Sequence, residues 1–192
     1  MKKKTLLLAA ALALICLSLA GYGTYAYYAA ETRTHNVVTS GSVKIRVVEK
    51  TEKDGELVDF PAEGLSRIAP GTSASKIVSV ENTGGAPAWV RMKVAIAAED
   101  AQGQALDSSV ISFDSGEGWA DGGDGFYYYQ SELLPGTSTE PLMREVHFAP
   151  EMGNEYRGCS VKVTVEAHAV QCKNNPVPDG GSVRDVSGWP EA

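Results

Sequence analysis

Beyond residue 42 the chain contains short runs in which hydrophobic and polar residues alternate with a period of two. A period of two places successive side chains on opposite faces of a β-strand. The two cleanest runs cover residues 88–97 and 160–170. Their apolar faces are expected to hold Ala88, Val90, Met92, Val94 and Ile96 in the first run and Val161, Val163, Val165, Ala167 and Ala169 in the second. Strict alternation of this kind is typical of an antiparallel sheet with one solvated face.

Further short strands are expected at residues 43–47, 75–81, 110–113, 126–130 and 142–148. Turn sequences separate them, among them Pro70-Gly71 and Asn82-Thr83-Gly84-Gly85. Residues 50–55 are charged and predict a turn or loop, and residues 57–65 predict an irregular piece. Seven or eight short strands with Gly/Pro turns indicate an all-β fold, an antiparallel sandwich or barrel over residues 42–173.

The N-terminus has the organisation of a secretory signal peptide. Lys2, Lys3 and Lys4 precede an apolar stretch at residues 6–20. As a helix this stretch would span ~22 Å, less than the ~30 Å hydrocarbon core of a bilayer. Thr24 and Ala26 are small residues at positions −3 and −1, which predicts cleavage after Ala26. The alternative is an uncleaved membrane anchor, and the membrane is then contacted only through this signal helix.

Cleavage changes the charge of the chain. The sequence has 17 basic and 24 acidic side chains, and residues 1–26 contain three lysines and no acidic residue. The mature chain therefore keeps 14 basic and 24 acidic side chains and a net charge of −10. This balance argues against nucleic acid or an anionic lipid surface as the main partner. Residues 174–192, with Pro176, Pro178, Gly180 and Gly181, are expected to form a flexible tail.

Two cysteines, Cys159 and Cys172, remain after cleavage. They flank the strand expected at residues 160–170, and 13 residues of extended chain cover ~43 Å. A disulfide needs Cα atoms within ~7 Å. Unless the chain folds back between them, the two thiols stay free or pair with another molecule.

The candidate sites for chemistry are sparse. His35, His147 and His168 match no zinc-binding motif, and each is interpreted as a solvent-side residue of a strand or linker. The Gly-rich stretch at residues 114–125 could offer calcium its carboxylates, but its spacing is not that of an EF-hand, and a solvated turn is the simpler interpretation. Its acidic residues are Asp114, Glu117, Asp121 and Asp124. No catalytic residue and no cofactor are therefore assigned.

An aromatic run at residues 126–129 could stack on a sugar. Alternation puts Phe126 and Tyr128 on one face and Tyr127 and Tyr129 on the other, so one pair is expected in the core. The other pair either covers a sheet edge or binds a ligand.

Several pieces in a fixed order resemble the TasA/camelysin family of Gram-positive bacteria, which is exported through a SipW-type signal peptidase. The resemblance covers most of residues 1–175. The pieces are a short Lys-led signal ending in Gly-x-Gly-Thr-Tyr-Ala, Ser40-Gly41-Ser42-Val43-Lys44-Ile45, Pro70-Gly71, Val80-Glu81-Asn82-Thr83-Gly84, Ala88-Trp89-Val90-Arg91-Met92-Lys93-Val94, Tyr127-Tyr128-Tyr129, Leu134-Pro135-Gly136-Thr137-Ser138-Thr139 and Val165-Glu166-Ala167.

The resemblance implies a jelly-roll sandwich that is secreted to the extracellular matrix or cell surface as a non-enzymatic fibre protein of biofilm type. It also implies self-assembly, in which the mature N-terminal segment pairs as a strand in the next subunit. Here that segment is residues 27–41, and Tyr27, Tyr28, Val37 and Val38 are its candidate assembly residues. The implied partners are the chain itself, a related accessory or anchoring protein, and the signal peptidase during export.

Two departures and two alternatives accompany this resemblance. Cys159 and Cys172 do not belong to the usual family pattern, and no zinc-ligand motif supports the metalloprotease activity described for some members. A secreted camelysin-like zinc metalloprotease and a surface-displayed ligand-binding module stand as alternatives to the fibre protein.

Overall fold

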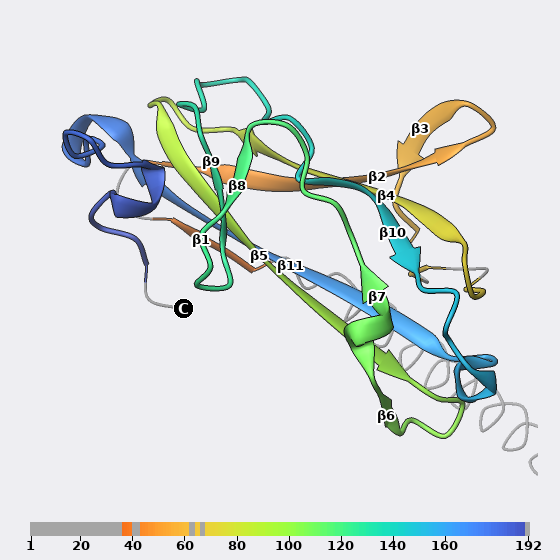
Figure 1. Cartoon of the computed structure of the whole chain (residues 1–192). Coiled ribbons are helices and arrows are strands. Elements are labelled where there is room, and N and C mark those ends of the chain that lie inside the picture. The colour runs from red at the N-terminus through yellow and green to blue at the C-terminus, as the bar shows by residue number, and fades with distance from the viewer. Residues whose placement is uncertain (1–35, 40–42, 62–63, 66–67, 191–192) are drawn as a thin grey trace, which may run out of the picture. The chain divides into compact units, whose positions relative to one another are not determined.

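The computed structural model describes residues 36–39, 43–61, 64–65 and 68–190 (Figure 1). All of these residues belong to one compact unit. The expected signal helix, its cleavage site at Ala26, and Tyr27 and Tyr28 lie outside the described residues.

The described residues contain eleven strands and four short 3₁₀ helices. They are β1 (Asn36–Thr39), β2 (Ile45–Lys53), β3 (Glu56–Asp59), β4 (Ser73–Asn82), β5 (Ala88–Glu99), β6 (Ala105–Leu106), η1 (Ser108–Val110), β7 (Ile111–Ser112), β8 (Trp119–Asp121), β9 (Tyr127–Tyr129), β10 (Met143–Phe148), η2 (Asn154–Tyr156), β11 (Ser160–Gln171), η3 (Cys172–Asn174) and η4 (Val183–Asp185). Both runs with clean alternation, residues 88–97 and 160–170, are strands.

The strands form two sheets, which confirms the prediction of an all-β two-sheet architecture. The six-stranded sheet has the order β1-β11-β5-β9-β8, with β6 also on β5, and the five-stranded sheet has the order β3-β2-β4-β10-β7. Figure 1 shows β2 and β4 in one layer and β5 and β11 in the other. Neighbouring strands are antiparallel with one exception, because β1 pairs with β11 in parallel.

The main core lies between the sheets and uses the apolar faces predicted from the alternation. β5 contributes Val90 and Met92, and β11 contributes Val165 and Ala167, all of them buried. The five-stranded sheet adds Val78 from β4 and other aliphatic residues. Burial of one such Val or Met side chain stabilises the fold by roughly 1.5–3 kcal/mol.

The β2–β3 hairpin corrects two predictions, the loop at residues 50–55 and the irregular piece after it. Asp54 and Gly55 have φ values of 54° and 82° and form the two-residue turn of this hairpin. Asp-Gly tolerates positive φ at both positions, which suits a tight hairpin turn. The charged composition was misleading because β3 is exposed along its whole length, so neither face needs to be apolar.

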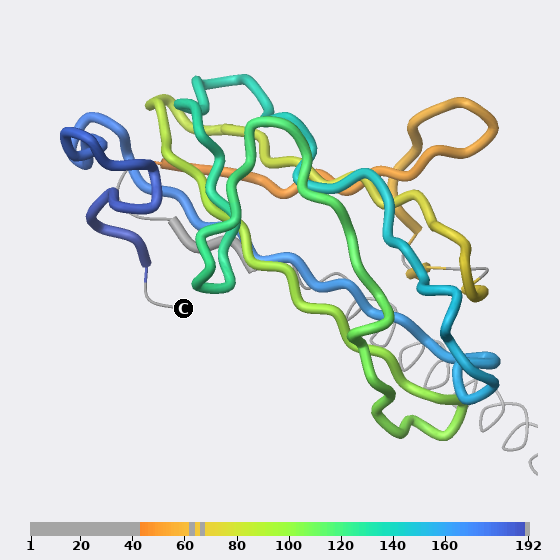
Figure 2. The backbone as a smooth tube through the Cα atoms, viewed as in Figure 1, coloured from red at the N-terminus to blue at the C-terminus, as the bar shows by residue number. Residues whose placement is uncertain are grey.

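The C-terminal segment corrects a third prediction, that of a flexible tail. Residues 172–190 lie against the outer face of the six-stranded sheet, at the end where β5 begins (Figure 2). Val183 and Val186 are buried there against Trp89 and Val170. The indole Nε1–H of Trp89 donates to the carbonyl of Asn175 at 2.8 Å. The outer face of this part of the sheet is therefore not exposed to solvent, because the few apolar residues of the C-terminal segment cover it.

Candidate assembly site

Strand β11 has two different neighbours in the six-stranded sheet. On one side it pairs with β5 in antiparallel register over twelve residues, from Ser160 opposite Glu99 to Gln171 opposite Ala88. On the other side it pairs with β1 over only four residues, from Asn36 opposite Glu166 to Thr39 opposite Ala169. Val37 and Val38, two of the predicted assembly residues, thus form part of the edge strand of their own domain.

The rest of this edge of β11 has no strand partner among the described residues. It comprises residues 170–171 and the longer stretch 160–165, which extends over ~20 Å at 3.3 Å per residue. A strand edge presents a row of main-chain N–H and C=O groups that can pair with another chain.

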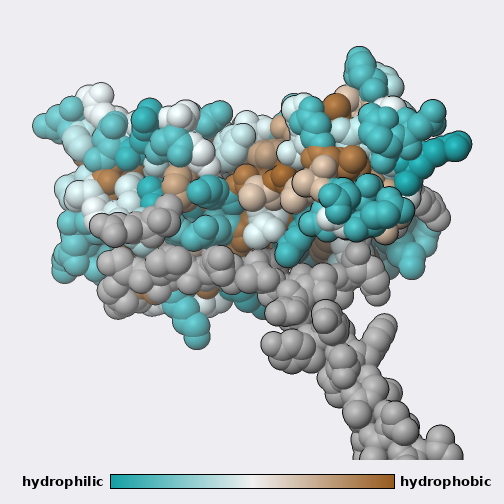
Figure 3. Space-filling view, turned by 90° about the horizontal axis from the view of Figure 1, so that it is seen from below, coloured by the Kyte–Doolittle hydropathy of each residue, from teal (hydrophilic) through white to brown (hydrophobic). Residues whose placement is uncertain are grey.

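Burial on the core side varies along this stretch. Val161 and Val165 are buried, whereas Val163 between them is only partly buried, as are Val94 and Ile96 on the neighbouring strand β5. Apolar surface gathers across the middle of the face seen from below (Figure 3). A strand added along residues 160–165 would lie next to Val163 as well as the main-chain groups of this edge.

A buried ion pair lies on the inward face of the five-stranded sheet. Lys76 of β4 is 1% exposed, and its Nζ lies 2.9 Å from Oε1 of Glu49 and 3.7 Å from the ring centre of Phe60. Burial lowers the pKa of Lys76, and the adjacent Glu49 carboxylate partly offsets this effect. The hydrophobic core is thus interrupted by a charged pair at the end of the sheet that β3 occupies.

The chain connects β1 to β2 across the two sheets. β1 belongs to the six-stranded sheet, whereas β2 begins at Ile45 in the five-stranded sheet. Residues 40–42 between them have the sequence Ser-Gly-Ser. β1 therefore has its ladder with β11 and none with the strand that follows it in the chain.

His168 is not the solvent-side residue that was predicted, because its side chain is fully buried on the outward face of β11. His35 lies outside the described residues. The Nδ1 of His168 accepts a hydrogen bond from Nε of Arg91 at 3.2 Å, so its Nε2 carries the proton and donates to Glu166 at 2.9 Å. Arg91 also donates from Nη2 to the carbonyl of Pro190 at 2.6 Å. The C-terminal segment, β5 and β11 are joined through this polar chain.

The guanidinium group of Arg91 lies against two aromatic rings, one of which belongs to the C-terminal segment. Its carbon lies 3.9 Å from the ring centre of Phe126 and 5.0 Å from that of Trp189. Period-two alternation indicated an outer face at residue 168, but nothing in the pattern indicated that residues 172–190 would cover it.

The aromatic run divides as its alternation predicts. Tyr127 and Tyr129 pack against the main core, where their ring centres lie 5.4 Å from Phe113 and 5.2 Å from Trp119. Phe126 and Tyr128 are buried in a second hydrophobic cluster, which they form with Trp89, Val170 and the C-terminal segment. The pair on the outer face is therefore covered and offers no open stacking surface for a sugar.

The acidic Gly-rich loop uses its carboxylates for internal hydrogen bonds. Asp124 accepts from the Tyr128 hydroxyl at 2.8 Å and from the Phe126 amide at 3.1 Å. Burial disfavours its charged form, but these hydrogen bonds outweigh it and lower the pKa of Asp124. Asp121 accepts from the Gly123 amide, and Asp114 lies 3.3 Å from His147. In the part of the chain that the structure describes, no three His, Cys, Asp or Glu side chains are grouped to hold a metal ion.

Both mature cysteines are free thiols at opposite ends of β11. Cys172 is buried, and burial, with a smaller effect of the Glu132 charge, raises its thiol pKa to about 12. Burial also raises the pKa of Cys159, which is only partly buried. The two cysteines are therefore separated by an extended strand, as predicted. Cys159 is the more accessible of the two thiols.

Comparisons of the chain with protein-family models, with curated proteins and with solved structures find no match. Among the described residues, no helix has the length and apolar character needed to cross a bilayer.

Proposed function

We propose that this chain is a secreted, non-enzymatic structural protein that assembles into fibres by exchanging its N-terminal strand between copies. The observation that carries the proposal is the pairing of β1, four residues in parallel at the edge of β11, beside six edge residues with no described strand partner. The resemblance to the TasA/camelysin family supports the same function and the jelly-roll type of sandwich. It also supports an extracellular matrix or cell-surface location on a Gram-positive bacterium.

The exchange is energetically inexpensive because the same contacts form in either arrangement. β1 leaves β11 of its own domain and pairs with β11 of a neighbour in the same register. A four-residue ladder is lost and an identical ladder is gained. Each copy then gives a strand at one point and receives one at another, and a head-to-tail contact that does not close generates a filament.

Export processing provides the timing in this proposal. Before cleavage after Ala26, the segment that precedes β1 is continuous with the apolar signal. After cleavage by a SipW-type signal peptidase, Tyr27 is the new N-terminus and the segment is free to reach a neighbour. A related accessory or anchoring protein with the same edge could start or end the filament.

A reversible lock tests the exchange. Asn36 and Glu166 are opposite each other in the register, so Asn36→Cys with Glu166→Cys in a Cys159→Ser background places two thiols within reach of a disulfide. Oxidised mature protein, residues 27–192, is expected to stay monomeric by light scattering and electron microscopy. Addition of a reductant to the same sample is expected to start filament formation.

The reduced form of the variant is the matched control, since it has the same three substitutions and differs only in the covalent bond. Filaments that grow equally well from the fully oxidised protein would show that β1 does not leave its own domain, and the proposed mechanism would be wrong. A second variant without residues 27–39 is expected to stay monomeric in both conditions.

A further inference from the structure

The register of β1 on β11 determines where the mature N-terminus falls if the strand continues. Each residue of β1 lies opposite the residue 130 positions later, from Asn36 with Glu166 to Thr39 with Ala169. In the same register Tyr28 falls opposite Gly158 and Tyr27 opposite Arg157. Because β11 begins at Ser160, two tyrosines in this register would extend past the end of the strand to the loop that contains η2.

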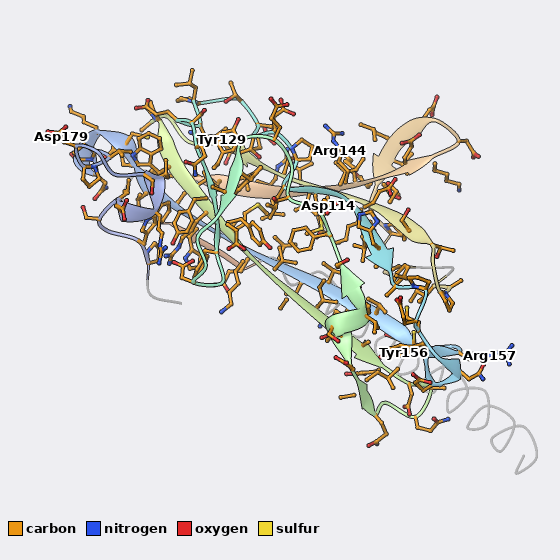
Figure 4. All side chains as sticks on the ribbon, viewed as in Figure 1. Asp114, Tyr129, Arg144, Tyr156, Arg157 and Asp179 are labelled. Atoms are coloured by element: carbon orange, nitrogen blue, oxygen red, sulfur yellow. The ribbon has the colours of Figure 1, made fainter. Side chains whose placement is uncertain are left out.

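A groove of about 550 Å³ lies at that place. One wall is the loop before β4, with Ile68 and Pro70, and the other is the η2 loop, with Met152, Tyr156 and Arg157. Figure 4 shows Tyr156 and Arg157 together where β11 begins. The loop before β4 also passes close to β11 itself, because a Cβ built on Gly64 would lie 3.9 Å from the carbonyl oxygen of Val161.

The groove has a rigid apolar floor and a polar rim. Met152 and Tyr156 are 5% and 7% exposed, and the Tyr156 hydroxyl donates to the carbonyl of Asp107 at 2.8 Å. At the rim, the Arg157 side chain is exposed and can stack on an aromatic ring. A floor of this kind with a cation at the edge suits a tyrosine side chain, which has an apolar ring and a polar hydroxyl.

A carboxylate is also available for the new ammonium group. Glu155 is folded back so that its carboxylate lies directly against Gly153, which lines the groove. A Cβ at position 153 would collide with this carboxylate, so glycine permits the approach. An α-ammonium placed in the groove can pair with Glu155, and capture of a chain terminus by a pocket is a recurring mode of recognition.

We infer that this groove binds the mature N-terminus, Tyr27–Tyr28, of a second copy of the chain. The inference rests on the proposed strand exchange, and it adds an anchor at the far end of the exchanged strand. The tyrosine rings occupy the space above Met152 and Tyr156, and the ammonium group of Tyr27 faces Glu155. An uncleaved chain has no ammonium group at this position, so the anchor is available only after processing.

Photo-crosslinking tests the location directly. Tyr28 is replaced with p-benzoylphenylalanine in the mature chain, and tagged and untagged copies are mixed before assembly and irradiation. We expect the main cross-link between copies to join position 28 to residues 152–157 of the other copy, as read by mass spectrometry. A main cross-link to any other region, or cross-links confined to single copies, would overturn the inference.

Three variants test the energetics without touching the floor of the groove. Asn154→Trp fills the groove from an exposed position, and Asn174→Trp is its matched control at another exposed site. Glu155→Gln removes the carboxylate, with Glu151→Gln as the control in the same loop. One added glycine before Tyr27 moves the ammonium group. We expect a critical concentration for assembly at least tenfold higher for Asn154→Trp, and severalfold higher for Glu155→Gln and the extended chain.

These outcomes separate the two proposals. If Asn154→Trp, Glu155→Gln and the glycine extension all assemble like their controls, while the oxidised lock still blocks assembly, the groove is not the anchor and strand exchange stands. If the oxidised lock assembles freely, strand exchange is wrong and the inference is overturned with it. An unchanged melting temperature for each variant establishes that its fold is intact.

Discussion

The two edges of β11 differ in the number of paired residues, in the direction of the partner strand and in the sheet to which the partner strand leads. The β5 side has twelve antiparallel pairs, and the strands it joins supply Val90, Met92, Val165 and Ala167 to the main core. The β1 side has four parallel pairs, and β1 continues into β2 of the other sheet. Free energies of local opening range from near zero at poorly supported edges to the global value in the core.

This contrast explains how one strand can hold the domain together and also receive an exchanged partner. Separation of β11 from β5 would expose the main core and amounts to global unfolding. Separation of β1 from β11 breaks a short ladder and leaves the β5–β11 pair intact. The pairing of β11 with β5 is therefore permanent, and in our proposal the pairing of β11 with β1 is exchangeable.

The largest expected effect is on the β5 side. Met92→Ala deletes a fully buried side chain opposite Ala167 and leaves a cavity, so it is expected to lower the free energy of unfolding by about 3 kcal/mol. Urea unfolding followed by circular dichroism measures it. The control is Lys162→Ala, an exposed position on the neighbouring strand β11, which should change the value by less than about 0.5 kcal/mol. Equal effects of the two substitutions would contradict the role of β5 as the permanent neighbour.

A smaller effect is expected on the β1 side. Removal of residues 27–39 deletes the four-residue ladder, and at about 0.5 kcal/mol net for each of its four paired residues the loss is roughly 2 kcal/mol. The same unfolding measurement on the truncated and mature chains gives the difference. A truncated chain that fails to fold would show that β1 is part of the permanent domain, and the comparison between the two sides would then fail.

The sequence predicted the two-sheet architecture and the faces of β5 and β11, because both strands alternate strictly and burial follows that alternation. The parallel pairing of β1 was not predictable in the same way. Val37 and Val38 are consecutive β-branched residues without alternation, and the parallel register depends on a distant strand. The C-terminal cover was missed for a related reason. Val183, Val186 and Trp189 are isolated apolar residues in a segment rich in Gly and Pro, yet they pack into one cluster around Trp89 and Tyr128.

The candidate site shows the same limit. A polar residue in a period-two pattern indicates an outer face, and His168 does lie there. Whether that face is wet depends on residues 172–190, which return to it from another part of the chain. The groove beside η2 likewise combines residues 68–70 with residues 152–157, and only the fold brings these two loops together.

The last prediction concerns the two ends of β11 and involves no change in stability at neutral pH. Cys159 immediately precedes the strand and is partly buried, and Cys172 follows it under the C-terminal segment. Burial raises both thiol pKa values, that of Cys172 to about 12, so at pH 8 roughly one Cys172 thiol in ten thousand is a thiolate. Iodoacetamide labelling at pH 8, followed by peptide mass spectrometry, should therefore modify Cys159 well before Cys172.

The labelling rate of Cys172 and the free energy of unfolding should both depend on pH. Labelling of Cys172 should accelerate about tenfold per pH unit above pH 8, because each unit multiplies the thiolate fraction by ten until the pKa is reached. The unfolded chain, with an ordinary thiol pKa, loses this proton first, so the free energy of unfolding should fall as the pH rises from about 9 toward 12. Equal labelling of both thiols at pH 8 in the folded protein would mean that the C-terminal segment does not protect Cys172. The two ends of β11 would then not differ in thiol reactivity.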